Sequence, residues 1–409
     1  MRASLPHFAA CGWDVRVLAI RPDEMELPED SLLSETVPAE ITVRRVGALP
    51  LAWGRRIGLG ASGLRALPHL ARAGARWIRE WQPHLVYFST TQFPVTALGR
   101  VWRRQFGVPY VVDMQDPWVT GTRSVIPSQR SGLKHRMMRT LHRTLEPWTM
   151  KHVGGLISVS QGFVDALRER YPALRERPAR VVRFAQAEAD FKVLERHPQP
   201  NAFFNPGDGC VHGVYVGRGG HNLARSLRLF FQAWRAGLER EPARFGPVRL
   251  HFVGTDYAPA GQGRQTVAPL AAEYGLADRV TETPERQPYF TALHLLRAAD
   301  FLIVPGSEEP EYAASKLCGC VLARRPIVAT FHERSNAVAL LRGTGAGEVV
   351  TFGDAPDGPE TVVDVGRAWS RVLEQGGAAP STNWEAFAPY GAAQATRDQC
   401  AVFDAVIAA

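Results

Sequence analysis

Two stretches of the sequence decide the fold: residues 213–221, GVYVGRGGH, and residues 301–317, FLIVPGSEEPEYAASKL. Each begins as a short apolar run, passes through a loop rich in glycine or proline, and continues into a segment with helical patterning. This is the pattern of a parallel sheet whose strands are joined by crossover helices. We therefore predict an α/β protein.

The same alternation of short apolar runs and segments with helical patterning recurs on both sides of these stretches. In the first half it predicts strands at residues 15–20, 41–46, 85–88, 110–113, 156–159 and 180–184. In the second half it predicts strands at 213–216, 248–253, 279–283, 301–304, 327–330 and 348–351. Helices are predicted over 65–81, over 96–106, from an N-cap at Ser160 to Arg170, and from starts near Asn222, Thr266, Pro288, Ala313 and Ser335.

The length of 409 residues exceeds what one hydrophobic core usually serves, so two domains of about 200 residues are expected. This alternation is interrupted between Glu195 and Gly209, where proline, asparagine and glycine are frequent, as in interdomain linkers. We therefore assign residues 1–195 to a first domain, 196–210 to a linker and 211–380 to a second domain.

Composition narrows the class of protein. The sequence has no apolar run of about 18 residues that would span a bilayer, and its N-terminus lacks a signal peptide's cleavage site. The five cysteines are scattered without a CxxC pair, which suggests neither a disulfide framework nor a zinc site. A reduced, cytoplasmic location is the default expectation.

The net charge of +8 indicates an anionic partner, and the segment from Arg123 to Glu146 concentrates it. Basic residues there alternate with apolar ones at helical spacing; they are Arg123, Arg130, Lys134, Arg136, Arg139 and Arg143. Two interpretations stand: a solvated basic face packed by its apolar side on the domain, or peripheral contact with an anionic membrane at its inner face. No nucleic-acid-binding signature accompanies the charge, so nucleic acid is not the expected partner.

The turn from Gly217 to His221 follows a predicted strand and opens a helix. Glycines let a backbone approach a ligand closely, helix N-termini offer free N–H groups, and Arg218 supplies a forked cation. Together these features suit a diphosphate. A purely structural strand-to-helix turn is the alternative.

The loop after the strand at 301–304 is acidic, and ligands of open α/β sheets bind outside the carboxyl ends of strands. Carboxylates such as Glu309 and Glu311 accept hydrogen bonds from sugar hydroxyls, while Ser315 and Lys316 suit a phosphate. The alternative is that these acids only stabilise the dipole of the following helix.

In the first half, the loop DMQDPW at residues 113–118 also follows a strand. Asp113 and Asp116 are candidates for a general base or for orienting an acceptor hydroxyl, with Ser89, Thr90 and Thr91 lining the same side. A turn built on aspartate side chains and Pro117 is the alternative. No histidine clusters with these acids, so no metal site is expected.

With these segments placed, the chain resembles the family 4 glycosyltransferases of the GT-B fold. The resemblance rests on YVGRGG at 215–220, LHFVGTDY at 250–257 and the stretch from AAEYGLADRV to RRPIVA at 271–329, with DMQDPW and GLISVSQGF in the first half. It implies two Rossmann-like domains facing a central cleft, the donor held mainly by the second. It also implies that the C-terminal segment, 381–409, returns as a helix to the first domain.

The resemblance assigns roles to individual residues. Arg218, flanked by Gly217 and Gly219, would contact the donor diphosphate, and Glu311, beside Tyr312, would lie near the donor sugar. Thr255, Glu285 and Arg286 occupy positions where the family holds the nucleobase. One departure concerns the ribose, because the second glutamate of the family's E-x7-E element is replaced by Gly319.

A second departure concerns the start of the sequence. The family has a first strand and a glycine-rich loop before the helix that leads to GWDV, whereas Met1 falls inside what resembles that helix. We expect the start to be trimmed and the strand to be missing from this numbering, which would leave a gap in the first sheet.

The expected activity is transfer of a hexosyl group from a nucleotide-diphosphate sugar to a hydroxyl of a cell-surface glycan or lipid-linked acceptor. The resemblance implies retention of anomeric configuration, and no cofactor is expected. Two alternatives stay open: an epimerase-like GT-B enzyme acting on sugar nucleotides, and a non-catalytic GT-B scaffold.

Overall fold

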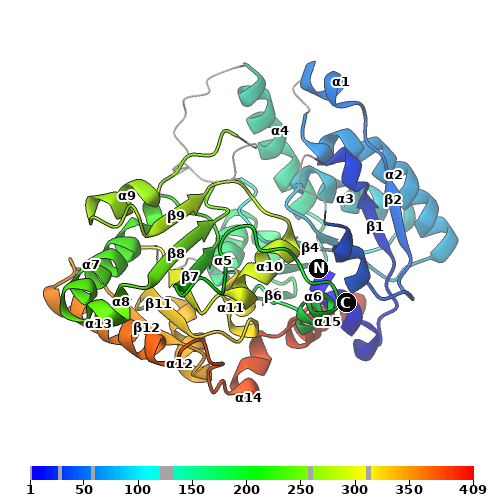
Figure 1. The fold of residues 1–409 in the computed structure, drawn as a ribbon. Coiled ribbons are helices and arrows are strands. Elements are labelled where there is room, and N and C mark those ends of the chain that lie inside the picture. Colours follow the sequence, from blue (N-terminus) through cyan, green and yellow to red (C-terminus); the bar gives the residue numbers. More distant parts are fainter. Residues whose placement is uncertain (1, 26–29, 57–59, 120–132, 257–260, 310–314) are drawn as a thin grey trace. The chain divides into compact units, whose positions relative to one another are not determined.

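The computed structural model describes residues 2–25, 30–56, 60–119, 133–256, 261–309 and 315–409. Its contacts divide the chain into two compact units. Unit 1 comprises Met1–Leu27, Val37–Arg183 and Ala392–Ala409, and unit 2 comprises Pro28–Thr36 and Phe184–Gly391. Both units are built on parallel strands with helices packed on them, which confirms the α/β class (Figure 1).

Unit 2 contains one six-stranded parallel sheet in the order β12-β11-β10-β7-β8-β9. Its strands are β7 (Val211–Val216), β8 (Val248–Val253), β9 (Val280–Thr283), β10 (Phe301–Pro305), β11 (Ile327–His332) and β12 (Glu348–Phe352). The chain proceeds from β7 to one side and later returns to pair β10 with its other edge. The carboxyl ends of β7 and β10 are therefore a topological switch point, where ligands of such sheets bind.

Helices cover both faces of this sheet because successive strand residues point to opposite sides. Val214 and Val216 belong to a core with α10–α12, while Tyr215 belongs to a core with α7 and α13 (Figure 1). The helices of unit 2 are η4 (Ser31–Thr36), α6 (Glu188–Arg196), η7 (His221–Leu223), α7 (Ala224–Arg240), α8 (Pro242–Phe245), α9 (Ala268–Glu273), α10 (Tyr289–Ala298), α11 (Leu317–Leu322), α12 (Asn336–Thr344), α13 (Pro359–Glu374), α14 (Trp384–Phe387) and η8 (Ala388–Tyr390).

Unit 1 divides its strands between two parallel sheets. A four-stranded sheet has the order β3-β4-β5-β6, from β3 (Val86–Ser89), β4 (Tyr110–Met114), β5 (Gly155–Ser158) and β6 (Ala179–Val181). A separate pair joins β1 (Val17–Ile20) to β2 (Val43–Val46). The helices are η1 (Arg2–His7), η2 (Ala9–Cys11), η3 (Pro22–Glu24), α1 (Leu51–Arg56), α2 (Ser62–Trp81), η5 (Phe93–Thr96), α3 (Ala97–Phe106), α4 (Leu133–Met150), α5 (Gln161–Arg170), η6 (Pro172–Leu174) and α15 (Ala392–Ile407).

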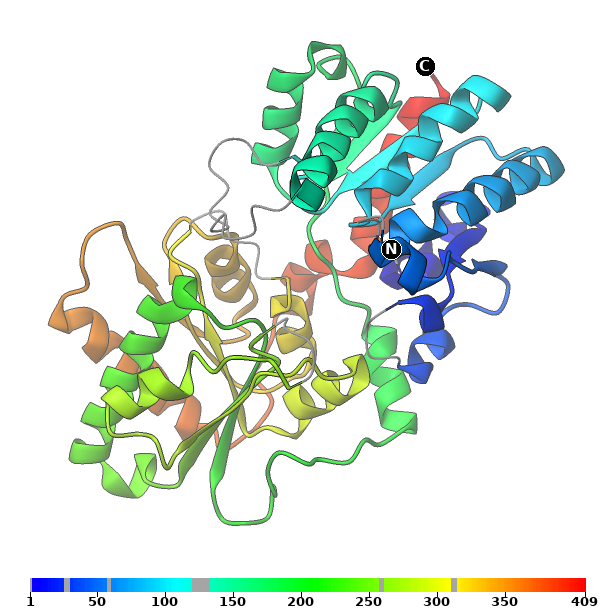
Figure 2. The same cartoon turned by 90° about the horizontal axis from the view of Figure 1, so that it is seen from above.

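The last helix of the chain, α15, packs in unit 1 with η1, β5 and β6. Figure 2 shows this red helix beside the cyan and green elements of that unit. Phe403 anchors it, with ring centroids 6.1 Å from Phe8 and 4.9 Å from Tyr87. On the other face of the strands α2 and α3 pack together, and the rings of Phe88 and Trp102 stack at 5.9 Å. None of the described helices is long and apolar enough to cross a membrane.

The borders of the units differ from the boundaries expected at residues 195 and 380. The main segment of unit 2 begins at Phe184, because α6 packs on α10, and it extends to Gly391, because α14 packs on α12. The segment 196–210, expected to be a linker, also belongs to unit 2. Phe203 and Phe204 pack against the core of that unit, so apolar burial fixes a segment whose proline and glycine content suggests a free connection.

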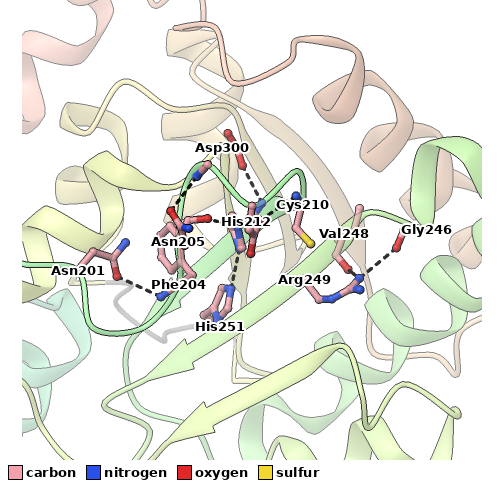
Figure 3. A network of polar contacts seen from close by, with 12 residues as sticks. Asn201, Phe204, Asn205, Cys210, His212, Gly246, Val248, Arg249, His251 and Asp300 are labelled. Carbon is pink, nitrogen blue, oxygen red and sulfur yellow. Dashed lines mark hydrogen bonds and ion pairs between the residues drawn. The ribbon is translucent and has the colours of Figure 1, made fainter.

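A network around two histidines fixes this segment on the sheet (Figure 3). The Phe204 ring stacks on His212 of β7 and His251 of β8 at 4.6 and 4.8 Å. The Nδ1 of His212 and the Nε2 of His251 are 3.0 Å apart, and the His251 Nδ1 lies 2.8 Å from the Thr281 hydroxyl. Burial, with a smaller contribution from His212, lowers the pKa of His251 to about 4.

Acid is expected to destabilise unit 2 through His251. Its pKa in the folded chain, about 4, lies below the ordinary 6.5, so the unfolded chain binds the proton more readily. The free energy of unfolding should therefore decrease as the pH falls from about 6.5 to about 4, by as much as about 3 kcal/mol. Urea unfolding at several pH values, compared between the unmodified chain and His251→Gln, measures this difference. A pH dependence that is identical in the two proteins would contradict the assignment.

Candidate active site

The turn after β7 and the turn before α11 meet in unit 2. Gly217 and Arg218, which follow β7, line a cavity of about 50 Å³ together with Ser315 and Lys316, which precede α11. Pro305, at the carboxyl end of β10, also lines it. The cavity therefore lies at the switch point of the six-stranded sheet, between two neighbouring strands.

Close packing explains the glycines of the first turn. A Cβ added to Gly217 would lie 2.6 Å from the Tyr215 hydroxyl oxygen, and one added to Gly219 would lie 2.8 Å from the Thr266 Oγ1. The Tyr215 hydroxyl donates to the carbonyl of Arg218 over 2.9 Å, so it holds the turn in place. Gly220 has a φ of 117°, which L side chains rarely adopt.

The turn is also tied to the loop after β8. The Gly219 N–H donates to the carbonyl of Thr255 over 2.8 Å. Thr255 is buried, and its hydroxyl donates to Oε1 of Glu282 over 2.6 Å. Thr255 thus holds the turn through its carbonyl and is itself held by the buried carboxylate of Glu282. The sequence analysis did not identify Glu282.

Glu282 connects this loop to the start of α9. Its two carboxylate oxygens accept backbone N–H groups from Thr266, Val267 and Ala268 at 3.0, 2.8 and 2.8 Å. The residue is 7% exposed, so these groups depend on one another rather than on water. The available signal was an acid inside the strand VTET, two residues after Val280 and therefore on the same, buried face of the strand.

The start of the acidic loop is held by α7 and the residues before it. The Ser226 hydroxyl donates to the carbonyl of Gly306 over 2.6 Å, and the Glu308 N–H donates to the carbonyl of Asn222 over 3.2 Å. The Glu309 N–H donates to the Ser307 hydroxyl over 3.1 Å, and Glu309 is exposed. Glu311, Tyr312 and the expected helix start at Ala313 lie outside the described residues.

Positive charge gathers at the cavity. Lys316 is exposed as a residue, but surrounding protein desolvates its ammonium group and lowers its pKa, and the charge of Arg286 lowers it further. Arg286 and the half-buried Glu285 follow β9, which β7 and β8 separate from β10 in the sheet. A bound anion would offset this repulsion, because opposite charge favours the charged form of a lysine.

Gly319, which stands in place of a glutamate, faces another polar cluster. A Cβ at this position would lie 3.6 Å from Oε1 of Gln186. The Gln186 amide donates to the buried carboxylate of Asp190 over 2.5 Å, and the Tyr289 hydroxyl donates to the same Oδ2 over 2.5 Å. Sequence reasoning missed this cluster, because its three members are far apart along the chain.

In unit 1, the stretch expected as an acidic loop, residues 113–118, begins inside β4, because Asp113 and Met114 still pair with β5. Asp113 is buried, and its Oδ2 accepts from the Ser89 hydroxyl at 2.9 Å, the Tyr87 hydroxyl at 3.2 Å and the Gln115 amide at 2.8 Å. Such a network stabilises the carboxylate and positions its neighbours. Thr90 accepts the Gln92 N–H at its hydroxyl over 2.9 Å, and Thr91 is exposed.

Asp116 has a different environment from Asp113. It is exposed as a residue, yet partial desolvation raises the pKa of its carboxyl group. Two residues on, Trp118 is buried, donates its indole N–H to Nδ1 of His142 over 2.7 Å and stacks on Phe93 at 5.5 Å. The loop is thus anchored at Trp118 while Asp116 stays accessible to solvent.

The expected basic helix is α4. Arg136, Arg139 and Arg143 are exposed, whereas Glu146 is buried and forms an ion pair with Arg170. Arg123, Arg130 and the side chains of Leu133 and Lys134 lie outside the described part of the chain. Among the described residues, no group of His, Cys, Asp or Glu side chains is arranged to hold a metal ion.

A family model matches the first half of the chain, whereas solved structures match nearly all of it. Residues 3–185 match the family model described as a glycosyl transferase 4-like domain. No curated protein matches the sequence.

Solved structures similar to the whole chain have the GT-B fold. The alpha,alpha-trehalose-phosphate synthase (UDP-forming) of Burkholderia vietnamiensis matches with a TM-score of 0.55 at 13% identity, over 96% of this chain and 97% of that one. HepE of Anabaena, solved with UDP and glucose, matches with 0.53 at 13% identity, over 96% and 100%. An E. coli structure described as trehalose-6-phosphate bound with UDP-2-fluoro glucose matches with 0.53 at 11% identity, over 96% and 99%. The chain therefore has the GT-B glycosyltransferase fold, as predicted.

Proposed function

We propose that this GT-B protein transfers a hexosyl group from a nucleotide-diphosphate sugar to a hydroxyl group, with retention of anomeric configuration. The observation that carries the proposal is the meeting of Gly217 and Arg218 with Ser315 and Lys316 around one cavity at the switch point. A glycine turn with a forked cation beside a lysine and a hydroxyl is suited to a diphosphate.

The chemistry follows from where charge develops. When the bond between the sugar and the diphosphate breaks, negative charge grows on the leaving phosphate oxygen. Arg218 and Lys316 would stabilise that charge, and electrostatic stabilisation of this kind is usually the largest single contribution to catalysis. The lowered pKa of Lys316 supports the role, because an anion bound there would favour the charged form of the lysine.

The remaining donor contacts are proposed from the resemblance to the family 4 glycosyltransferases. Thr255, Glu285 and Arg286 follow β8 and β9 and would hold the nucleobase. Glu309, with Glu311 and Tyr312, would accept hydrogen bonds from the donor sugar. UDP is the first nucleotide to test, since two of the similar structures contain UDP or a UDP-sugar analogue.

Of the two aspartates, Asp116 is the better candidate for deprotonating the acceptor hydroxyl. A raised pKa and exposure suit a general base, whereas the Asp113 carboxylate is occupied by Ser89, Tyr87 and Gln115. We assign Asp113 an orienting role, with Ser89, Thr90 and Thr91 on the acceptor side.

The acceptor is proposed to be a cell-surface glycan or a lipid-linked sugar. Three exposed arginines on α4, with Met137 45% exposed beside them, suit contact with an anionic lipid surface. The protein would then work in the cytoplasm at the inner face of the membrane.

Donor binding tests the proposal directly. At about 100 times its Kd, a nucleotide-diphosphate sugar should stabilise the chain by about 2.7 kcal/mol, which corresponds to a rise in Tm of about 5 °C or more. A thermal-shift panel of nucleotide-diphosphate sugars measures this, with nucleoside monophosphates as the matched control. Product analysis with the stabilising donor then separates transfer to an acceptor from epimerisation of the donor. A panel in which no diphosphate sugar raises the Tm would contradict donor binding and favour a scaffold.

A further inference from the structure

A short segment from the first half of the sequence belongs to unit 2. Residues Pro28–Thr36 are part of that unit, although the chain on either side of them, Met1–Leu27 and Val37–Arg183, belongs to unit 1. The segment lies within the connection from β1 to β2. We call its described part, residues 30–36, the strap.

Apolar and polar contacts hold the strap on unit 2. Leu32 and Leu33 of η4 pack against the core that includes α10, α11 and α12, and η4 also contacts α6. Near the other end of the strap, the Glu35 carboxylate lies 2.9 Å from Nε2 of His197, which follows α6. The strap is therefore fastened along its length to the helices on one face of the six-stranded sheet.

Asp30, the first residue of the strap, caps helix α10. Its Oδ2 accepts the Phe290 N–H over 2.8 Å, while its Oδ1 accepts the Leu32 N–H over 3.2 Å. Pro288, which stands at the N-cap position of α10, supplies no side-chain acceptor. A carboxylate from a distant part of the sequence thus satisfies an N–H group that the helix leaves free at its start, and the helix dipole favours its negative charge.

The helix start that Asp30 holds is also the end of the loop after β9. This loop, residues 284–288, contains Glu285 and Arg286, the candidates for nucleobase contact. The beginning of the loop is attached to the residues after β8, because the Asp256 N–H donates to the carbonyl of the first loop residue over 3.0 Å. The loop is therefore fixed at one end by the strap and at the other by a neighbouring strand connection.

The loop lies within electrostatic range of the candidate active site. Burial lowers the pKa of Lys316 and the charge of Arg286 lowers it further, and Lys316 lines the cavity together with Arg218. A loop that adopts its binding conformation only part of the time binds its ligand more weakly in proportion to that fraction. A contact that fixes the loop after β9 should therefore strengthen the binding of a nucleotide.

We propose that Asp30 is a positioning residue for the nucleotide of the donor, and that the strap and the bound nucleotide stabilise each other. The inference rests on the proposed function, because it takes the loop after β9 as part of the donor site. Coupling between two sites is reciprocal, so a contact that tightens nucleotide binding is itself stabilised by the same factor when the nucleotide binds. Nucleotide binding in unit 2 would then stabilise a segment whose neighbours along the chain belong to unit 1.

Hydrogen exchange in the full chain tests the coupling. The probe is the nucleoside diphosphate that raises the Tm most among ADP, CDP, GDP, UDP and dTDP, and the control is pyrophosphate, which has no nucleobase for the loop to hold. The nucleotide should slow exchange in residues 30–36 about fivefold and leave β12 unchanged, since couplings between sites are typically of this size or larger. Pyrophosphate should leave the strap unchanged. Equal protection by both, or none by a bound nucleotide, would overturn the inference.

A matched pair of variants separates the strap from the donor site. Asp30→Ala removes the cap of α10, so it should raise the Kd of the nucleotide about fivefold and abolish the slowing of exchange in the strap. Glu35→Ala removes an exposed ion pair of the same segment, which contributes little, and should leave the Kd within about twofold of the original value. Titration calorimetry measures both values.

The outcomes distinguish this inference from the proposed function. If the unmodified chain binds the nucleotide and Asp30→Ala binds it equally well, the inference is wrong while the proposed function stands. If the unmodified chain binds none of the five diphosphates, the proposed function is wrong and the inference falls with it. If Asp30→Ala does not fold, exchange in the unmodified chain decides, because that measurement needs no variant.

Discussion

Arg218→Ala is expected to lower kcat/KM for the nucleotide-sugar donor by about 100-fold or more. Removing one charged donor that stabilises developing negative charge costs about 3 kcal/mol or more in catalytic sites. Arg218 lies on the cavity with Lys316, so its loss would leave one cation to meet the leaving diphosphate. Steady-state kinetics with the donor identified by thermal shift measure the effect.

Two further variants make the result specific. Arg218→Lys keeps the charge but not the forked geometry, and it should recover only part of the activity. Arg342→Ala serves as the control, since this exposed residue lies in the last turn of α12, and that helix runs from the carboxyl side of the sheet toward the opposite side. Unchanged turnover in Arg218→Ala would show that the diphosphate is held elsewhere.

Glu282→Ala is expected to destabilise unit 2 by about 3 kcal/mol or more, because it leaves three backbone N–H groups and the Thr255 hydroxyl without their acceptor in a buried position. The same change should weaken donor binding, since Thr255 holds the Gly219 turn through its carbonyl. Urea unfolding and donor titration measure the two effects.

The control for this change lies in the helix that Glu282 caps. Glu273 is an exposed residue of α9, and Glu273→Ala should alter the free energy of unfolding by no more than about 0.5 kcal/mol. If Glu282→Ala proved as mild as Glu273→Ala, the buried carboxylate would not be what organises these loops.

Local patterns were sufficient for most of the secondary structure. Each predicted strand overlaps an observed one, and the range 248–253 coincides with β8. Short runs of buried β-branched residues between amphipathic segments make this possible, since strand and helix periodicities are local properties. Capping was less predictable: Ser335 caps α12 through its side chain, whereas Ser160 stands at the start of α5 without such a bond.

Part of the candidate site was also predictable from local patterns. Loops at carboxyl ends of parallel strands gather at one edge of a sheet, so Gly217, Arg218, Ser315 and Lys316 could be chosen before the structure showed them around one cavity. Their supports could not be chosen. Tyr215, Glu282 and the cluster of Gln186, Asp190 and Tyr289 act through partners that are distant along the chain.

The sequence by itself determined the α/β class, the positions of the strands along the chain and the loops that carry the donor candidates. Only the tertiary structure decided where the units divide, because Phe203, Phe204 and α6 are fixed by packing on unit 2, and because α15 packs on the strands of unit 1. It also distinguished Asp116 from Asp113, whose surroundings come from Tyr87 and Ser89. Burial, hydrogen bonding between distant residues and unfilled space depend on contacts in three dimensions, which no local pattern records.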